Sequence, residues 1–316
     1  MIAAFFTGIF LGGTDISVSG ILSSFSENFS QTGDGRIFLY VRLPRTAAAL
    51  VCGAALSVSG AVIQGVLANR LASPSIIGVN AGAGLAVTLC TALGVYGGLR
   101  FSLFAFLGAF VTVMAVNLFA RRIAASRGTM ILLGVAVNSF LNAVSSAVVT
   151  FMPEVAVMSN DFKVGDFSSV TYSRLFPSAV LIFVTLVILL TLTNELDVLT
   201  LGEDTARSLG LNTSVFRTLF LMFAAVLAGC AVSLAGLLSF VGLIVPHAVR
   251  RLVGSKSSRL LPLSALFGAP FVCLCDTGAR TLFSPYEIPV GIIMAFLGTP
   301  FFVFILVKGK GGHRVA

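Results

Sequence analysis

The sequence predicts an all-α polytopic membrane protein with about ten transmembrane helices. Of its 316 residues, 57% are hydrophobic and only 10% are charged, whereas about a quarter of the residues in a soluble domain are charged. Apolar runs of about 20 residues, the length that one helical crossing needs, recur along the chain. The apolar and polar residues do not alternate as they would in a transmembrane barrel. We therefore expect residues 1–316 to form one transmembrane domain.

The apolar segments can be placed in order, because polar, Gly or Pro residues close each one. The clear segments are 45–68, 75–96, 101–120, 129–151, 175–194, 217–235, 260–282 and 288–307. The run from Ile2 to Leu11 is too short to span, which predicts an incomplete first helix.

The region 236–254 needs a separate argument. If Arg217 and Arg250 lie on the same side, the chain between them must cross and return. At 1.5 Å per residue it is too short for two straight spans of about 30 Å. We expect a break in the Gly-rich stretch from Gly236 to Gly242, followed by a half-length helix through Pro246 and His247. Such irregular backbone at membrane depth must be surrounded by protein or must line a cavity.

The net charge of +8 reports topology through the positive-inside rule rather than nucleic-acid binding. With ten passes and both termini in the cytoplasm, the cytoplasmic residues are Arg70, Arg121, Arg122, Arg127, Arg207, Arg217, Arg250, Arg251, Lys256, Arg259, Lys308, Lys310 and Arg314. The outer residues are Arg36, Arg42, Arg45, Arg100, Lys163, Arg174 and Arg280. Arg42, Arg45 and Arg280, at outer helix ends, run against the rule.

An internal repeat relates two of the predicted spans. Residues 53–60 (GAALSVSG) and 229–236 (GCAVSLAG) share both glycines, an alanine and a serine. The first copy would run inward and the second outward, an inverted arrangement common in transporters. Small residues at this spacing also serve as helix-packing contacts, so the repeat alone does not decide the function.

The sequence holds little that could carry catalysis. It lacks a phosphate-binding loop of the G-x-x-x-x-G-K-[ST] type, so the chain does not hydrolyse nucleotide by itself. Its only histidines are His247 and His313, and its five cysteines lie in apolar segments without metal-ligand spacing. The one carboxylate within a span, Asp276, lies near the outer end of that span and is spaced to pair with Arg280 one helical turn later. We predict no catalytic residue, no metal site and no bound cofactor.

The polar segment 194–217 is the most informative loop. Its spacing predicts a short helix from about Glu203 to Leu209, a stop at Gly210, and a second short helix capped by Asn212 or Thr213. Two helices in a 24-residue loop would make a compact protrusion suited to docking in a partner's groove.

Four ordered segments carry a family resemblance. They are RLPRTAAALVCGAALSVSGAVIQGVLANRLASPSIIGVNAGAG (42–84), LGEDTARSLGL (201–211), SLAGLLSFVGLIVPHAVRRLVG (233–254) and EIPVGIIMAFLGTPFFVFIL (287–306). Together they resemble the FecCD permeases of type II ABC importers for ferric siderophores, haem and cobalamin. The resemblance implies a permease domain that pairs with a second permease subunit, two ATP-binding subunits that use ATP and Mg, and an extracytoplasmic substrate-binding protein. It also implies largely apolar pathway walls, with the chelate selected by the binding protein.

The resemblance assigns roles to particular residues. Arg42, Arg45 and Arg280 match the arginines that form salt bridges with glutamates of the binding protein, and we expect these pairs to be exposed. The coupling segment at about 200–215, which contacts the ATPase, matches Gly202, Glu203, Ala206, Arg207, Leu209 and Gly210. One cytoplasmic gate matches Asn69, Arg70 and Leu71, where Arg70 replaces the family's proline, and a second matches Ser126, Arg127, Gly128 and Thr129.

The sequence therefore predicts the permease subunit of an ATP-driven importer in a bacterial cytoplasmic membrane, most simply for a ferric siderophore. Haem or cobalamin import is the alternative within the family. A secondary carrier driven by an ion gradient would normally contain more buried carboxylates, and a passive channel or structural subunit would need no energy source.

Overall fold

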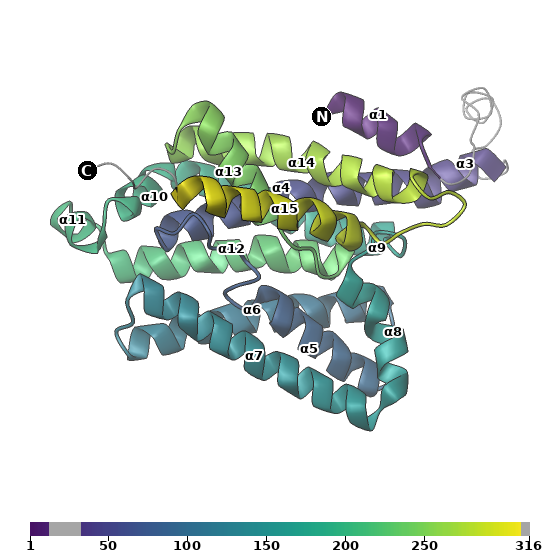
Figure 1. Ribbon diagram of the computed structural model, residues 1–316, viewed down its shortest axis with the longest axis horizontal. Helices are drawn as coiled ribbons and strands as arrows, with labels where there is room; N and C mark the ends of the chain where they lie inside the picture. Colours follow the sequence, from purple (N-terminus) through teal and green to yellow (C-terminus); the bar gives the residue numbers. More distant parts are fainter. Residues whose placement is uncertain (13–32, 311–316) are drawn as a thin grey trace.

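The structure is a computed structural model that describes residues 1–12 and 33–310, with side chains up to residue 304 (Figure 1). Every regular element in these residues is a helix. The α-helices are α1 (Ile2–Phe10), α3 (Gly33–Ile37), α4 (Leu43–Val66), α5 (Val79–Ala92), α6 (Gly98–Arg122), α7 (Arg127–Phe151), α8 (Pro153–Val164), α9 (Tyr172–Thr191), α10 (Thr193–Thr200), α11 (Glu203–Ser208), α12 (Thr213–Ala235), α13 (Val241–Val253), α14 (Ser257–Thr281) and α15 (Val290–Lys310). A π-helical turn, Phe38–Arg42, joins α3 to α4.

The helices confirm the predicted spans. Among the described residues, six helical segments are long and apolar enough to cross a membrane, and α5 and α15 are shorter apolar helices. With the short helices α1 and α13, they match in order the ten segments from which ten passes were predicted. α5 begins later than predicted because Gly78, with φ +108°, breaks the chain direction just before it. The helix α8, which begins at Pro153 and has low hydrophobicity, was not predicted.

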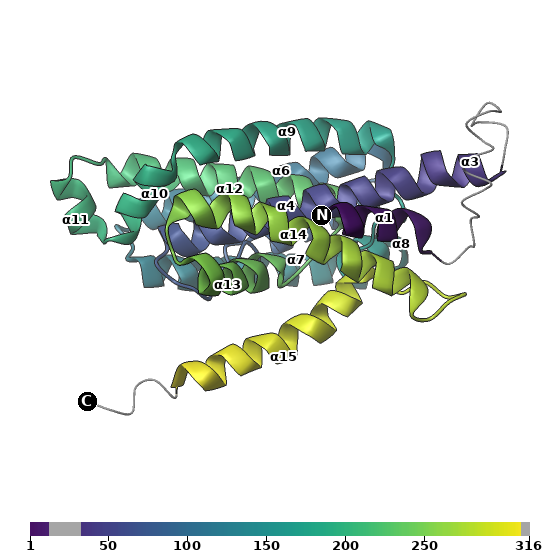
Figure 2. The same ribbon diagram turned by 90° about the horizontal axis from the view of Figure 1, so that it is seen from above.

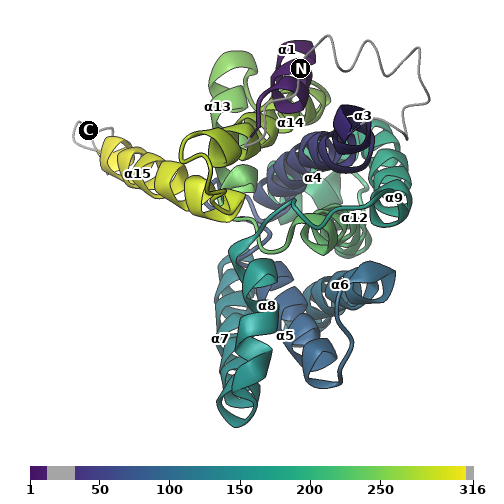
Figure 3. The ribbon, with the colours of Figure 1, turned by 90° about the vertical axis from the view of Figure 1, so that its right-hand side faces the viewer.

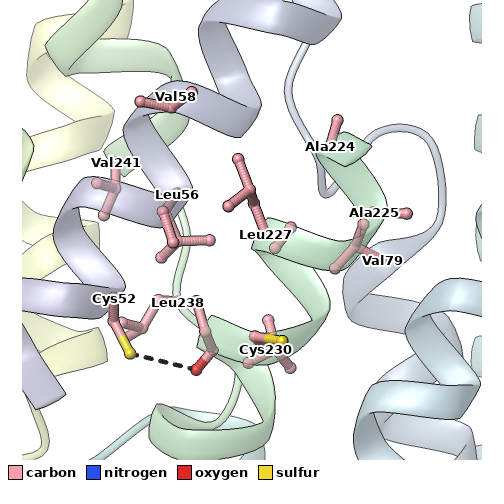
Figure 4. Close-up of a cluster of buried hydrophobic side chains, with 14 of the residues drawn as sticks. Cys52, Leu56, Val58, Val79, Ala224, Ala225, Leu227, Cys230, Leu238 and Val241 are labelled. Carbon is pink, nitrogen blue, oxygen red and sulfur yellow. Dashed lines mark hydrogen bonds between the residues drawn. The ribbon is translucent and has the colours of Figure 1, made fainter. Parts of the chain in front are cut away.

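The buried centre is built around α4, which lies between α12 and α14 in the end-on view (Figure 3). The Ser59 hydroxyl donates to the Ala224 carbonyl at 2.7 Å, and the Cys52 thiol lies 3.6 Å from the Ala231 carbonyl. From the first contact to the second, the residue number decreases on α4 and increases on α12, so the two helices are antiparallel. The inverted direction predicted for the repeat 53–60 and 229–236 is thereby confirmed, and the two copies pack against each other (Figure 4).

Glycines allow α4 to approach its other neighbours closely. A Cβ atom on Gly53 would lie 2.2 Å from the Gly268 carbonyl oxygen of α14, and one on Gly60 would lie 1.9 Å from the Gly242 oxygen of α13. Both distances are far below van der Waals contact. The small residues of the repeat are therefore packing contacts as well as a sign of internal symmetry.

The predicted break after α12 is present. α12 ends at Ala235, Gly236 adopts φ +72°, and α13 then runs for only 13 residues. The broken backbone is hydrogen-bonded within the protein: the Leu237 amide donates to the Phe162 carbonyl, and the Asp166 amide donates to the Ala235 carbonyl, both at 2.8 Å. This is the burial that irregular backbone at membrane depth requires.

The peripheral helices are much less buried than the centre. In the most apolar stretch of each helix, 72% of the residues of α12 are buried but only 11% of those of α7. α7 runs along one outer face (Figure 1), and α15 diverges from the other helices (Figure 2). Arg314 and His313 lie outside the described residues, as do the side chains of Lys308 and Lys310.

Candidate functional site

Two ends of the molecule carry the predicted site residues. The α11 end, at the left of Figure 1, holds α10, α11 and the start of α12, and the opposite α3 end holds the start of α4 and the end of α14.

The α3 end contains a buried ionic cluster centred on Arg45. Its guanidinium lies 3.0 Å from Asp276, 2.8 Å from Glu287 and 3.6 Å from Asp166. Asp276 also pairs with Arg280 at 3.2 Å, as its spacing on α14 predicted. Arg45 and Asp276 are 4% and 1% exposed, so each needs the other charge to offset its desolvation.

Arg42 and Arg280 hold the end of α1. The Arg42 guanidinium donates to the carbonyls of Ile9 at 2.6 Å and Phe10 at 2.9 Å, and Arg280 donates to the Gly8 carbonyl at 3.0 Å. These carbonyls belong to the last turn of a short helix, where the backbone has no intrahelical partner. The two side chains are each 3% exposed. This buried pairing explains why these residues depart from the positive-inside rule.

The expected exposure of Arg42, Arg45 and Arg280 is wrong for this structure. All three guanidiniums are covered, and their partners come from Asp276, Glu287 and the end of α1. The error arises because these partners are distant in the sequence from α4. Docking of a binding protein on these arginines stays a prediction.

The protrusion at the α11 end is present and lies at the extremity of the molecule (Figures 1 and 2). Gly202 precedes α11 with φ +116°, and Gly210 follows it with φ +83°, conformations that favour glycine. Ala206 is the buried anchor of α11, whereas Leu209 is 63% exposed. The predicted second short helix is wrong as a separate element: its residues form the first turn of α12, which Asn212 caps by accepting the Val215 amide hydrogen at 3.3 Å.

Glu203 connects α11 to the rest of the chain. Its carboxylate pairs with Arg207 at 3.0 Å and with Arg217 of α12 at 2.8 Å. Partial burial raises the pKa of Glu203, but the hydrogen bond and charge of Arg217, with the charges of Arg207 and Arg127, lower this pKa below its ordinary value. Glu203 is therefore ionised at neutral pH and braces α11 against α12, while Arg207, 63% exposed, faces outward.

The two predicted gate segments both lie against α10. Asn69 accepts the Leu71 amide hydrogen at 2.8 Å and so shapes the turn after α4, which leaves Arg70 exposed in a cavity that Thr200 also lines. Ser126 caps α7 by accepting the Thr129 amide hydrogen at 3.1 Å, next to Gly128. Arg127 donates to the Leu199 carbonyl at 2.8 Å. No recorded hydrogen bond or ion pair within the described part of the chain joins the two segments.

A polar cavity on the α7 side was not predicted. It has a volume of about 480 Å³ and is lined by the polar residues Ser75, Asn80, Asn138, Asn142, Ser145, Ser146 and Lys163, with Ala81, Gly84 and Leu237. Asn138 is fixed because its amide donates to the carbonyls of Ser75 and Ile76, each at 2.9 Å. The signal was present in the sequence, since Asn138, Asn142, Ser145 and Ser146 share one face of a helix. The lining of this cavity is more polar than the pathway walls that the resemblance implies.

The described residues contain no group of three or more His, Cys, Asp or Glu side chains that could hold a metal ion. All five cysteines are buried and unpaired by disulfides. His247 packs edge-on against Phe301, with ring centroids 6.2 Å apart.

An all-helical bundle with an inverted repeat, a buried broken helix and a protruding loop at one end defines a membrane permease. The chain belongs to the FecCD transport family, whose family model matches residues 1–308. The iron-uptake system permease FeuB of Bacillus subtilis is 32% identical over 97% of this chain and 92% of its own length. The vitamin B12 import permease BtuC of Vibrio vulnificus is 34% identical over 96% of this chain and 90% of its own length.

A solved structure supports the same assignment. The chain matches a structure described as an inward-facing conformation of a metal-chelate type ABC transporter, with a TM-score of 0.84 and 31% identity over 97% of this chain and 96% of that one. The protein is therefore an integral membrane permease of the metal-chelate type of ABC importer, a transport subunit rather than an enzyme.

Proposed function

We propose that this permease carries a ferric siderophore across the bacterial cytoplasmic membrane with both of its termini in the cytoplasm. It would pair with a second permease subunit, receive its cargo from an extracytoplasmic binding protein, and bind two ATP-binding subunits. ATP and Mg would be used by those subunits, and this chain would bind neither. The proposal rests on the protruding α11, which the ion pair between Glu203 and Arg217 holds to α12 and beside which the side chain of Leu209 is exposed. The chain that carries this protrusion resembles a metal-chelate type transporter over almost its whole length.

The ion pair between Glu203 and Arg217 suggests how a displacement of α11 would be transmitted to the membrane-spanning helices. Glu203 ties α11 to Arg217 at the base of α12, which packs along α4 in the rigid centre. α10 precedes α11, and the carbonyl of its Leu199 accepts from Arg127 at the base of α7. A displacement of α11 would thus act on the sparsely buried α7 while α4, α12 and α14 stay packed. The gate segments Asn69–Leu71 and Ser126–Thr129 lie on this route.

The polar cavity favours an oxygen-rich cargo. Amide and hydroxyl side chains can donate to and accept from a chelate, and Lys163 adds a positive charge to a lining that contains no carboxylate. A ferric chelate with carboxylate, hydroxamate or catecholate groups would match this lining better than an apolar ligand. Import of vitamin B12 is the second candidate, because BtuC resembles this chain about as well as FeuB does.

Docking of the binding protein would require the cluster at the α3 end to exchange partners. Glu287 is 45% exposed, so an incoming carboxylate could reach Arg45 by displacing it. Arg42 and Arg280 would become available only if α1 moved from their side chains.

Transport assays with defined cargoes test the proposal. The permease is reconstituted in proteoliposomes with its ATP-binding subunits and binding protein, and ATP-dependent uptake of ⁵⁵Fe-siderophores, haem and cobalamin is compared. We expect uptake of a ferric chelate, reduced by Asn142→Leu and Lys163→Gln but little changed by Lys256→Gln at the opposite end. Exclusive uptake of cobalamin or haem would contradict the proposed cargo.

A further inference from the structure

A second cavity, which shares no lining residue with the polar cavity on the α7 side, lies at the α11 end where α4, α10, α13 and α14 meet. It has a volume of about 230 Å³, and its polar lining consists of Gln64, Arg70, Thr200, Arg250, Ser255 and Ser257. The lining therefore supplies two guanidinium groups and several hydrogen-bond donors but no carboxylate.

One of the two arginines is held in place by the fold. Arg250 donates to the side-chain oxygen of Gln64, and the Gln64 amide donates to the Gly242 carbonyl at 3.0 Å. Gln64 is 3% exposed. Because the oxygen of Gln64 fixes one edge of the guanidinium, Arg250 is pre-organised toward the cavity.

The positive charges in this region are not neutralised within the protein. Arg70 and Arg250 are close enough for their charges to repel. Both also interact electrostatically with His247, which lies one turn before Arg250. Over the part of the chain that the structure describes, no ion pair involves Arg70, Arg250 or Arg251. Asp197 is nearby in the fold, but it accepts the Ser257 amide hydrogen at 2.8 Å and does not line the cavity.

Two like charges that line one cavity without a carboxylate are stabilised by an anion. Guanidinium groups match the planar pairs of oxygens on phosphate, and serine hydroxyls add neutral donors. We infer that the cavity between α4, α10, α13 and α14 binds a phosphate group, through Arg70 and Arg250 with Ser255 and Ser257. The group belongs either to the head of an anionic phospholipid or to free phosphate from solution.

The position of the site gives it a consequence for the permease. Arg70 lies on the turn after α4, Arg250 on α13 and Thr200 on α10. A bound phosphate group would join these three segments and hold the turn against the helix that leads to α11. The site would thus stabilise one position of the turn, whatever cargo the permease carries.

Binding of inorganic phosphate to the full chain tests this inference without a transport assay. The permease is placed in nanodiscs of phosphatidylcholine, and its thermal unfolding midpoint is followed as phosphate replaces chloride at constant ionic strength. We expect a saturable rise in the midpoint. Loss of one charge-assisted contact should weaken the apparent affinity by about tenfold or more in Arg70→Gln and Arg250→Gln.

Controls separate the site from general charge effects and from misfolding. Arg251→Gln, on the same helix but outside the cavity lining, should keep the wild-type affinity. Arg250→Gln also removes the hydrogen bond to Gln64 and so could disturb the fold. Arg70 is exposed and its side chain makes no hydrogen bond to the described part of the chain, so a loss of phosphate binding in Arg70→Gln reports the loss of its charge. Arg70→Lys should recover part of the affinity.

Nanodiscs that contain phosphatidylglycerol distinguish the two sources. If the lipid head occupies the site, the midpoint is raised before phosphate is added, phosphate has little further effect, and Arg70→Gln abolishes the rise. If free phosphate is the ligand, both membranes give the same titration. Equal responses of wild type and Arg70→Gln to both phosphate and phosphatidylglycerol would overturn the inference.

Discussion

At the scale of single residues, the charged side chains of this permease are used mainly within the chain. Arg45 lies among Asp276, Glu287 and Asp166, and Glu203 lies between Arg207 and Arg217. Arg45 and Asp276 of the first group are buried and the second group is partly exposed, so their energetic roles differ. A buried pair is costly to break because one charge is left without a partner, whereas an exposed pair contributes little.

Removing Arg45 therefore tests the buried cluster. Arg45→Ala leaves Asp276 with Arg280 alone, and we expect a loss of about 3 to 5 kcal/mol in the free energy of unfolding. Chemical unfolding in detergent, followed by circular dichroism, measures this loss. Arg100→Ala, which removes an exposed arginine of α6, should change the stability by no more than about 0.5 kcal/mol. Equal small effects of both substitutions would show that the cluster does not stabilise the fold.

The pH dependence of α11 tests Glu203. Because the pKa of Glu203 is lower in the folded protein, its stabilising pairs are complete above its unfolded value of about 4.3 and are lost as the pH falls through the folded value. A spin label at Ser208→Cys should become mobile in that acid range. Glu203→Gln should be mobile already at pH 7, whereas Asp204→Asn should behave as wild type. A label with the same mobility at pH 7 and pH 3 would contradict the role of Glu203.

At the scale of helices, close approach at glycines sets the packing of the centre. α4 meets α14 at Gly53 and α13 at Gly60, and both contacts bring two backbones together without side chains between them. Since lipid tails are as apolar as the helices, this van der Waals contact replaces the hydrophobic driving force available in water.

A methyl group at Gly60 should separate α4 from α13. With the added carbon 1.9 Å from the Gly242 oxygen, Gly60→Ala should cost about 1 to 3 kcal/mol through overpacking. Gly278→Ala is the matched control, because its nearest neighbour would be Leu282 at 3.8 Å and alanine favours a helix. Unfolding midpoints of the two variants in the same detergent give the comparison. A Gly60→Ala protein as stable as Gly278→Ala would exclude the contact.

At the scale of the whole molecule, a rigid centre of α4, α12 and α14 is flanked by α7 and α15, which bury little surface. Hydropathy predicted the spans. The chain length between Arg217 and Arg250 predicted a short pass, and the Gly-rich stretch Gly236 to Gly242 predicted where the break lies, because these properties can be read along the chain. The partners of Arg45 could not be predicted, since they come from loops and from α14, far away in sequence. The polar face of α7 could be predicted from the spacing of its polar residues. The cavity beside it could not, because residues of α5 and α8 also line it and their positions follow from the fold.

The proposed coupling of ATP hydrolysis in a partner subunit to transport through α11 can be tested directly by one experiment. ATP-dependent uptake of a ⁵⁵Fe-siderophore is measured in proteoliposomes with the ATP-binding subunits and either wild-type permease or Leu209→Asp, whose exposed leucine lies at the end of α11. We predict that wild type retains the ATP-binding subunits and transports only with ATP, and that Leu209→Asp loses both properties. Uptake by wild type that continues without ATP and collapses with a proton ionophore would contradict this coupling.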